Sequence, residues 1–437
     1  MSTAAAAADT PPAASAPAAI VPGERIATLD IVRGIAVMGI LAMNILAFGL
    51  PGEAYMNPTV IGMDDRGDFV SWLLGFIFVD GKMRGLFSFL FGASMLLVIE
   101  TAEAKGEPAA RIHFRRMAWL LVFGLLHFYF IWWGDILSLY ALVGIFAWLL
   151  RRQPARMMIM IGAALVLVQF LQMAMLAAMY SSIGAAASAP GATPAVLDLW
   201  RQMQIGFALT PAELAEDLAL FRGDYWTLFQ HRLAEEWYNP FVGAFMWGAE
   251  TLGYMLFGMA ALKTGFLTGA WDPARYRKWA LIGFGVGIPF YALLAWITVR
   301  ADFGVPTLVA TVLAGSTVVR PFMIVAIAAL IVLLTRRGGA LVDRIAAAGR
   351  AAFTNYLGTS ILMTGLFYGW GFGLFGTLDR VELWIPVVAM WALMLLWSKP
   401  WLDRFRYGPF EWLWRSLARG RIEPMRRIGP PSVTAGA

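Results

Sequence analysis

The sequence contains no cysteine and only three histidines in 437 residues. The absence of cysteine excludes disulfides, a thiolate nucleophile, cysteine-ligated zinc and cysteine-bound iron–sulfur clusters. Three histidines leave little material for a histidine-rich metal site, so we expect no metal and no covalently bound cofactor. A zinc-ligand spacing, a Walker A phosphate loop and a G-x-S-x-G nucleophile motif are also missing.

Charged residues are scarce as well. They make up 14% of the chain, while 60% of the residues are apolar; a soluble domain has about 25% charged and 45–50% apolar residues. Apolar runs of roughly 20 residues recur along the chain, and each is long enough to cross a ~30 Å hydrocarbon core as a helix. The predicted fold class is therefore all-α, a polytopic membrane helix bundle in the lipid bilayer.

Ten candidate membrane spans follow from the apolar runs. They are residues 29–50, 69–99, 117–133, 136–150, 157–180, 241–262, 279–298, 307–335, 352–376 and 382–398. The second span is interrupted by the polar residues 80–85, which predicts a kink or a discontinuous helix. The third and fourth spans are predicted to form a tight hairpin around Gly134 and Asp135.

The distribution of basic residues predicts the orientation. With a cytoplasmic N-terminus, 24 of the 34 Lys and Arg residues fall in cytoplasmic segments and six in outer loops. This bias follows the positive-inside rule, so both termini are predicted to be cytoplasmic. Because the basic residues lie in short loops between apolar runs, their excess does not indicate binding to nucleic acid.

Five segments organise the chain. Residues 1–24 are rich in Ala, Pro, Thr and Ser and lack the apolar core of a signal peptide, which predicts a disordered tail. Residues 25–180 and 241–400 form two five-span halves, and 401–437 form a basic cytoplasmic tail. Residues 181–240 form a long extracytoplasmic loop, whose amphipathic part (211–237) predicts either an interfacial helix or a lid over a cavity.

Polar side chains within the predicted spans indicate a functional interior. At a rise of 1.5 Å per residue, five of them share one slab of the membrane. These are Asn44, Lys82, His127, Glu250 and Arg320. They predict a polar cavity lined by several helices, with Asn44, Lys82 and His127 around one space. A buried ammonium needs a partner, so Lys82 is expected to have a buried acceptor or a carboxylate, Asp80 or Glu250.

Nearer the cytoplasmic face, Asp30 and Arg33 are spaced i, i+3 and can pair on one helix face. They are either part of a site or a structural ion pair at a helix end. Asn355 and Tyr356 enter the ninth span at a similar depth. His127 is either a functional base or a neutral core histidine. Asp135 follows eight residues later, so its direct pairing with His127 requires a bend between them.

Several segments together carry a family resemblance. They are LDIVRGIAVMGILAMNI (29–45), DGKMRGLFSFLFGAS (80–94), GLLHFYFIWWGDILSLYALVG (124–144), GRAAFTNYLGTS (349–360) and GPFEWLWRSL (408–417). The chain resembles the YeiB family of bacterial inner-membrane proteins, which is often labelled as of unknown function. The matching segments span nearly the whole chain in the family's order, whereas loop 181–240 carries no recognised motif.

The resemblance implies membership of the transmembrane acyltransferase superfamily, which includes the acyltransferase-3 proteins and the lysosomal heparan-glucosaminide acetyltransferase. The latter shares the L-D-x-x-R-G pattern, present here at 29–34, and an Asn in the following span that matches Asn44. Its catalytic His lies in the loop after the first span, but no His occurs here between residues 45 and 112. His127 is therefore the best substitute as the base.

The function expected from these features is acyl transfer from a cytoplasmic acyl-CoA donor to a lipid, glycan or small-molecule acceptor. His127 would act as base with Asp135, and Asn44, Lys82 or Arg84 would face the developing oxyanion. The remaining candidate binding residues are Asp30, Arg33, Glu250, Arg320, Asn355 and Tyr356. The alternative is a secondary transporter for a small anionic or amphipathic solute. A scramblase or structural subunit has no specific signal, and homo-oligomerisation is left open.

Overall fold

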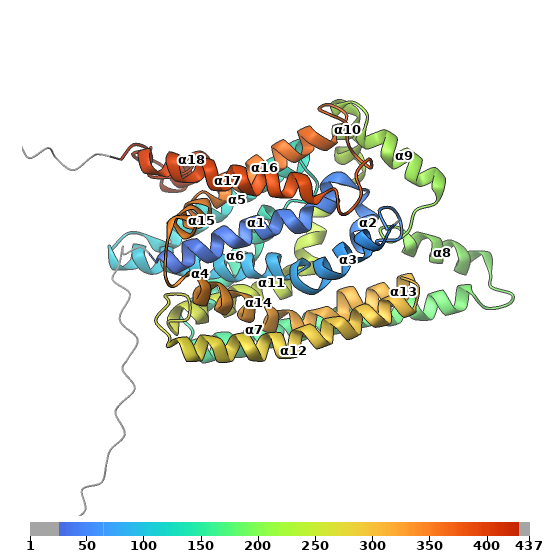
Figure 1. Ribbon diagram of the computed structural model, residues 1–437, viewed down its shortest axis with the longest axis horizontal. Coiled ribbons are helices and arrows are strands. Elements are labelled where there is room, and N and C mark those ends of the chain that lie inside the picture. Colours follow the sequence, from blue (N-terminus) through green and yellow to red (C-terminus); the bar gives the residue numbers. More distant parts are fainter. Residues whose placement is uncertain (1–25, 64, 428–437) are drawn as a thin grey trace, which may run out of the picture.

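The computed structural model describes residues 26–63 and 65–427, so the predicted N-terminal tail lies outside the described residues. Within these ranges the regular elements are helices, accompanied by one isolated antiparallel bridge between Phe405 and Arg426. The long helices run along a common axis (Figure 1). The predicted all-helical fold class is confirmed.

The helices fall into three consecutive groups. The first comprises α1 (Ala27–Gly49), α2 (Gly52–Met56), α3 (Arg66–Leu74), the π-helix η1 (Gly75–Val79), α4 (Lys82–Ala104), α5 (Ala109–Phe130), α6 (Leu137–Leu150) and α7 (Ala155–Ala187). The second comprises α8 (Pro194–Gln204), α9 (Pro211–Phe221) and α10 (Tyr225–Glu235). The third comprises α11 (Asn239–Lys263), α12 (Pro273–Arg300), α13 (Val305–Leu308), the π-helix η2 (Val309–Gly315), α14 (Ser316–Thr335), α15 (Ala340–Arg350), α16 (Ala352–Phe367), α17 (Trp384–Arg404) and α18 (Pro409–Arg419).

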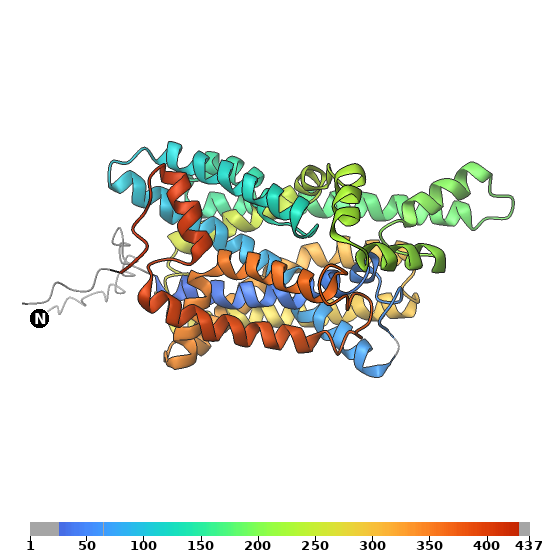
Figure 2. The same ribbon diagram turned by 90° about the horizontal axis from the view of Figure 1, so that it is seen from above.

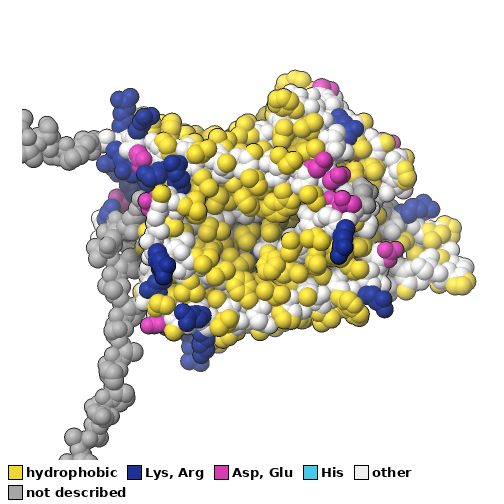
Figure 3. Space-filling model, viewed as in Figure 1, with side chains coloured by type: hydrophobic (Ala, Val, Ile, Leu, Met, Phe, Trp, Pro, Cys, Tyr) yellow, Lys and Arg dark blue, Asp and Glu magenta, His cyan; other side chains and the backbone are white. Residues whose placement is uncertain are grey.

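Among the described residues, six helical stretches are long and apolar enough to cross a membrane. They are α1, α3–η1–α4, α7, α12, α13–η2–α14 and α17. Apolar side chains cover the middle of the molecular surface, and Lys and Arg gather mostly at one end (Figure 3). These helices and this surface indicate a membrane protein.

The interruption predicted in the second span is present. η1 ends at Val79, and Gly81 adopts a left-handed conformation (φ 67°) before α4 begins at Lys82. A glycine is needed here for a second reason, because a Cβ at Gly81 would collide with the Arg320 guanidinium. A second π-helix, η2, precedes α14, and no sequence signal predicted it. Such π segments often occur at functional sites.

The predicted span 352–376 is too long and is corrected by the structure. Helix α16 ends at Phe367, and residues 368–376 form a loop with Gly373 and Gly376 at positive φ. The amide of Gly369 donates to the carbonyl of Phe221 at 2.9 Å, which ties this loop to α9. The composition stays apolar beyond Phe367, but glycines terminate the helix.

The amphipathic segment 211–237 forms two helices, not one. Thr210 and Glu213 form a capping box at the start of α9, and Asp224 accepts from the amides of Trp226 and Thr227 at the start of α10. These caps define two separate helix starts. Helices α8 to α10 lie at the end of the bundle opposite α15 and α18 (Figure 1).

The bundle core is packed closely where α4 meets α11. A Cβ at Gly92 would collide with the carbonyl of Met255, and one at Gly258 with the carbonyl of Phe89. Small residues of this kind let helix backbones approach each other. Helix α1 lies inside the bundle and contacts α4, α14, α15, α16 and α17. The C-terminal helix α18, red in Figure 2, lies across the direction of the long helices.

Candidate functional site

His127 and Asp135 form a buried hydrogen-bonded pair. Helix α5 ends at Phe130, and the following turn brings Asp135 back so that His127 Nδ1 donates to Asp135 Oδ1 at 2.9 Å. Each side chain is 1% exposed. The other carboxylate oxygen accepts from the Ser138 amide at 2.8 Å and from its hydroxyl at 2.6 Å. The helix end supplies the bend that direct pairing requires.

The second imidazole nitrogen of His127 is not engaged by the described residues. Nε2 is buried and has no hydrogen-bond partner among the described residues. The acceptor-only carboxylate of Asp135 places the proton on Nδ1, which leaves the Nε2 lone pair free to accept one. The ring centroid of Tyr356 lies 5.2 Å from that of His127, and that of Trp132 lies 6.2 Å away.

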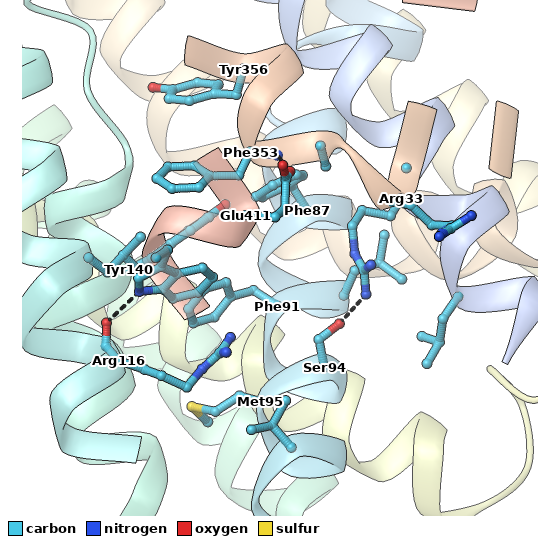
Figure 4. A pocket seen from close by; sticks show the side chains of 18 of the residues that line it. Arg33, Phe87, Phe91, Ser94, Met95, Arg116, Tyr140, Phe353, Tyr356 and Glu411 are labelled. Carbon is cyan, nitrogen blue, oxygen red and sulfur yellow. Dashed lines mark hydrogen bonds between the residues drawn. The ribbon is translucent and has the colours of Figure 1, made fainter. Parts of the chain in front are cut away.

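A cavity of about 330 Å³ lies between α1, α4, α5, α6, α16 and α18, and residues at the end of α15 also line it. We call it the Arg33 cavity (Figure 4). Arg33 donates to Asp30 at 3.3 Å and also to the hydroxyl of Ser94. The predicted i, i+3 pair is confirmed, and both of its members line this cavity together with Tyr356.

The Arg33 cavity combines an apolar body with several basic side chains. Leu90, Phe91, Met95 and Leu120 are among the apolar lining residues. The basic lining residues are Arg33, Arg116, Arg350 and Arg415. The cavity can therefore accommodate a hydrocarbon chain, with guanidinium groups available for an anionic head.

A second cavity, of about 450 Å³, lies farther along α1, where Ile40 and Asn44 line it, and it is bordered by α2 and the start of α11. We call it the Asn44 cavity. Its polar lining residues are Asn44, Tyr55, Asp80, Arg84, Asp135, Ser138, Asn239 and Arg320. Four predicted site residues, Asn44, Arg84, Asp135 and Arg320, are thus brought around one space.

The two cavities approach each other at Ile136. This residue lines both cavities, and its backbone amide donates to the Tyr356 hydroxyl at 3.3 Å. His127 itself lines neither cavity, but its partner Asp135 lines one and its neighbour Tyr356 lines the other. The imidazole is therefore placed in the partition between the two cavities.

Glu250 bridges two arginines from different helices. Its carboxylate accepts from Arg84 at 2.6 Å, from Tyr254 at 2.6 Å and from Arg320. Glu250 is fully buried and does not line the Asn44 cavity, whereas Arg84 and Arg320 do. The carboxylate thus stands behind the two guanidinium groups as seen from the cavity.

Lys82 lies away from the predicted common space. It is fully buried, its ammonium donates to the Phe76 carbonyl in η1, and Nζ lies 3.3 Å from the Tyr291 ring centroid. The prediction of a buried acceptor is confirmed, but Glu250 is not that partner. Lys82 lines neither the Arg33 cavity nor the Asn44 cavity, so the prediction that it shares a cavity with Asn44 and His127 is wrong.

Asn355 holds helices together and does not face either of these cavities. Its amide donates to the Ala348 carbonyl at 3.0 Å, and its side-chain oxygen accepts from Trp397 at 2.8 Å. These bonds join α15, α16 and α17. The adjacent Tyr356, in contrast, lines the Arg33 cavity.

Sequence reasoning missed Ser138 and Glu411. Ser138 stands three residues after Asp135, a spacing at which an acidic side chain commonly caps a helix start. Glu411 accepts from the amides of Phe353 and Thr354 at 2.6 and 3.0 Å, and it lines the Arg33 cavity. Burial raises the pKa of the Glu411 carboxyl. No local signal links Glu411 to α16, because the contact joins distant segments.

Comparison of the sequence with known proteins identifies the family of this chain. The family described as "Protein of unknown function (DUF418)" matches residues 261–421. The uncharacterized protein YeiB of Escherichia coli (strain K12) is 32% identical over 416 residues, which cover 93% of this chain and 98% of that protein. The chain belongs to the YeiB family.

Two further relatives match the chain over nearly the same length. The uncharacterized protein YxaH of Bacillus subtilis (strain 168) is 30% identical over 418 residues, covering 92% of this chain and 96% of that protein. The uncharacterized 39.9 kDa protein in the amylase 3' region of Bacillus acidopullulyticus is 26% identical over 410 residues, with coverage of 92% and 96%. No solved structure matches the chain. The similarity to YeiB thus includes the segment with His127 and Asp135, which precedes the DUF418 region.

Proposed function

We propose that this YeiB-family protein is a membrane acyltransferase that moves an acyl group from a cytoplasmic acyl-CoA to an acceptor on the outer side. The observation that carries the proposal is the buried His127–Asp135 pair, whose free Nε2 lies in the partition between two cavities. A transferase needs a donor site, an acceptor site and a base between them, and this arrangement offers one of each.

The proposed topology is ten crossings of the inner membrane with both termini in the cytoplasm. The basic end of the molecule, which carries α15 and α18, then faces the cytoplasm, in agreement with the positive-inside rule (Figure 3). In this orientation the Arg33 cavity faces the cytoplasm, where acyl-CoA is available, and the Asn44 cavity faces outward.

The proposed reaction is a base-catalysed transfer of the acyl group from the thioester to the acceptor. His127 Nε2 takes the proton of the acceptor hydroxyl or amine, whose heteroatom attacks the thioester carbonyl. The carbon–sulfur bond then breaks as the new acyl bond forms, and the imidazolium returns its proton to the departing CoA thiolate. The Tyr356 hydroxyl accepts from the Ile136 amide, so its own proton is free to stabilise the oxyanion. Because Ile136 stands in the partition, its side chain must move aside during transfer.

Release of CoA tests the proposal. Purified protein in proteoliposomes that contain native lipid and glycan extracts should release free CoA from acetyl-CoA or a longer acyl-CoA. His127→Gln keeps hydrogen bonding but cannot accept a proton at neutral pH, so it should lower the rate by ~10²–10⁴-fold with unchanged expression. No binding of acyl-CoA to the purified protein, together with an intact cellular phenotype of His127→Gln, would refute acyl transfer.

A secondary transporter for an anionic or amphipathic solute is the second candidate. Two helices interrupted by π segments meet where the Arg320 guanidinium packs on Gly81, beside the Asn44 cavity. Interrupted helices at a binding site are typical of secondary transporters. Solute flux across proteoliposomes without any release of CoA would favour this function.

A further inference from the structure

The two guanidinium groups on the Asn44 cavity have hydrogen-bond donors that the protein does not use. Arg84 Nη1 and Arg320 Nε are buried and have no hydrogen-bond partner in the described part of the chain. The side chains of Arg84 and Arg320 are only 16% and 5% exposed. A buried charged donor without an acceptor is unfavourable, so a ligand oxygen or water is expected there.

The single carboxylate that pairs with both arginines already accepts three hydrogen bonds. Glu250 accepts from Arg84, Arg320 and Tyr254, and it lies outside the cavity lining. This one carboxylate is thus shared by two guanidinium groups, and the guanidinium groups line the cavity wall. Two other carboxylates, Asp80 and Asp135, line the same cavity; Asp80 accepts from the Tyr55 hydroxyl at 3.0 Å, and Asp135 is bound by His127 and Ser138.

The shape of the donor set favours a phosphate group. Arg84, Arg320 and Asn44 come from three different helices and border one space of about 450 Å³. Donors from several directions suit the tetrahedral oxygens of a phosphate, whereas a planar carboxylate is satisfied by one guanidinium fork. Apolar residues Ile40, Val242 and Met246 line the same cavity and can contact the hydrocarbon part of an amphiphile.

We propose that the Asn44 cavity binds a phosphate group between Arg84 and Arg320. The phosphate belongs either to a lipid headgroup or to a soluble phosphorylated compound. Its assignment as part of the acyl acceptor rests on the proposed function, but the binding itself does not. Under that function the acceptor is a phosphorylated molecule, held with its hydroxyl or amine toward Asp135 and the partition.

Thiol labelling in this cysteine-free chain provides the test. Gly243 lines the Asn44 cavity, and a Cβ at this position meets nothing within 4 Å, so Gly243→Cys places a single thiol there without a clash. In bilayers of a phosphate-free glycolipid, we expect inorganic phosphate or glycerol phosphate to slow modification by a thiol reagent saturably. Acetate at equal ionic strength is the control anion and should not protect.

A lipid source is tested by changing the bilayer. A lipid headgroup is identified if labelling is slower in phosphatidylglycerol bilayers than in the phosphate-free glycolipid and if soluble phosphates have no effect on the labelling rate. Protection by soluble phosphate identifies a soluble ligand. If neither the soluble phosphates nor phosphatidylglycerol slows labelling, the proposal is overturned.

Variants in the Gly243→Cys background locate the effect. Arg84→Gln should raise the phosphate concentration for half-protection by at least about tenfold, since a hydrogen bond to a charged group is lost. Arg344→Gln removes an arginine that donates to the Leu395 carbonyl in α17 and lines neither cavity, so it should leave protection unchanged. Undiminished protection in a folded Arg84→Gln protein would contradict the site.

Glu250→Gln supplies a prediction of opposite sign. This change removes the balancing carboxylate but keeps a hydrogen-bond acceptor, so phosphate should protect at an equal or lower concentration. If Arg84→Gln does not fold, the Glu250→Gln measurement decides whether phosphate binds at this site. Loss of protection in a folded Glu250→Gln protein would overturn the proposal. The labelling assay contains no acyl-CoA, so it is independent of the CoA-release assay. Protection by phosphate in the first assay without CoA release in the second would refute acyl transfer but not the phosphate site. CoA release without protection by phosphate would refute the phosphate site but not acyl transfer.

Discussion

The hydrogen bond from His127 to Asp135 gives the two imidazole nitrogens different environments. Nδ1 is bound to the carboxylate, while Nε2 has no partner among the described residues. Asp135 is itself fixed by the amide and hydroxyl of Ser138. A histidine oriented in this way keeps one tautomer and holds its lone pair in a constant direction, as a general base requires.

Replacing Asp135 tests that orientation. In Asp135→Asn, the side-chain amide can donate to the imidazole and favour the wrong tautomer, so CoA release should fall by ~10²–10⁴-fold. The melting temperature should change less than in Asp135→Ala, which leaves the buried His127 and Ser138 donors without an acceptor at a cost of ~1–3 kcal/mol. Wild-type CoA release by Asp135→Asn would show that the pair is structural.

Spacing in the sequence predicted some residue contacts and not others. The Asp30–Arg33 pair follows from helix geometry alone, because residues three apart share a face. The partners of Lys82 and Asn355 depend on the π-helix η1 and on the packing of α15 against α17. Such contacts join elements whose relative placement the sequence does not specify.

Helix α10 holds the end of α5 near His127. Arg232 is 2% exposed and donates to the carbonyls of Phe128 and Tyr129 at 3.2 and 3.1 Å, and the Tyr225 hydroxyl donates to the Phe130 carbonyl at 2.8 Å. The last carbonyls of a helix lack intrahelical partners, so Arg232 acts as a cationic cap. The long loop thereby positions the turn that carries the His127–Asp135 pair.

Removal of this cap should loosen the turn. Arg232→Gln is expected to lower protein stability by about 1.5–3 kcal/mol and to speed amide hydrogen exchange at residues 127–136, because hydrogen bonds from a charged group are lost. Arg201→Gln, an exposed arginine on α8 that pairs with Asp198, is the matched control and should have little effect. Equal exchange in both variants would contradict a positioning role for Arg232.

The contact between α9, α10 and α2 should depend on pH. Burial, together with the charges of Glu53 and Glu236, raises the pKa of the Asp217 carboxyl to about 7. Arg232 and His231 face the neighbouring Glu236. Because the pKa of Asp217 is raised in the folded state from its ordinary value of 3.8, the stability gained by protonating this carboxyl is complete below about pH 4 and is lost as the pH rises through about 7.

Amide hydrogen exchange over residues 211–235, corrected for intrinsic rates, measures this effect. Protection should be lower at pH 8 than at pH 5.5 in the wild type, and Asp217→Asn should remove most of the difference. Asp198→Asn, on the exposed face of α8, should leave the pH dependence as it is. A pH-independent wild type would rule out titration of Asp217 in this contact.

Helix existence was more predictable than helix extent. The apolar runs located the long helices, and the polar residues 80–85 located the break before α4. The end of α16 at Phe367 and the division of α9 from α10 depend on glycine conformations and on caps. The short helices α2, α15 and α18 were not predicted, because none of them contains a long apolar run; α15 and α18 are amphipathic, with charged and apolar residues interleaved.

The whole molecule has two ends of different charge character joined by an apolar middle. Most of the Lys and Arg side chains visible in Figure 3 gather at the end near α15 and α18, whereas acidic side chains are prominent near the other end. The Arg33 cavity lies toward the first end and the Asn44 cavity toward the second. This polarity gives the proposed transfer a direction, from a donor at the basic end to an acceptor at the opposite end.

Cysteine labelling at the two ends tests this direction. Ser188 follows α7 at the end near α8, and Ser416 lies on α18 at the basic end. In intact cells, a membrane-impermeant thiol reagent should label Ser188→Cys directly but Ser416→Cys only after permeabilisation, since the chain has no other cysteine. Both positions are polar residues near helix ends, so neither change should disturb the apolar core. Identical accessibility would contradict the ten-span topology, and the reversed pattern would place the Arg33 cavity outside, where cytoplasmic acyl-CoA could not reach it.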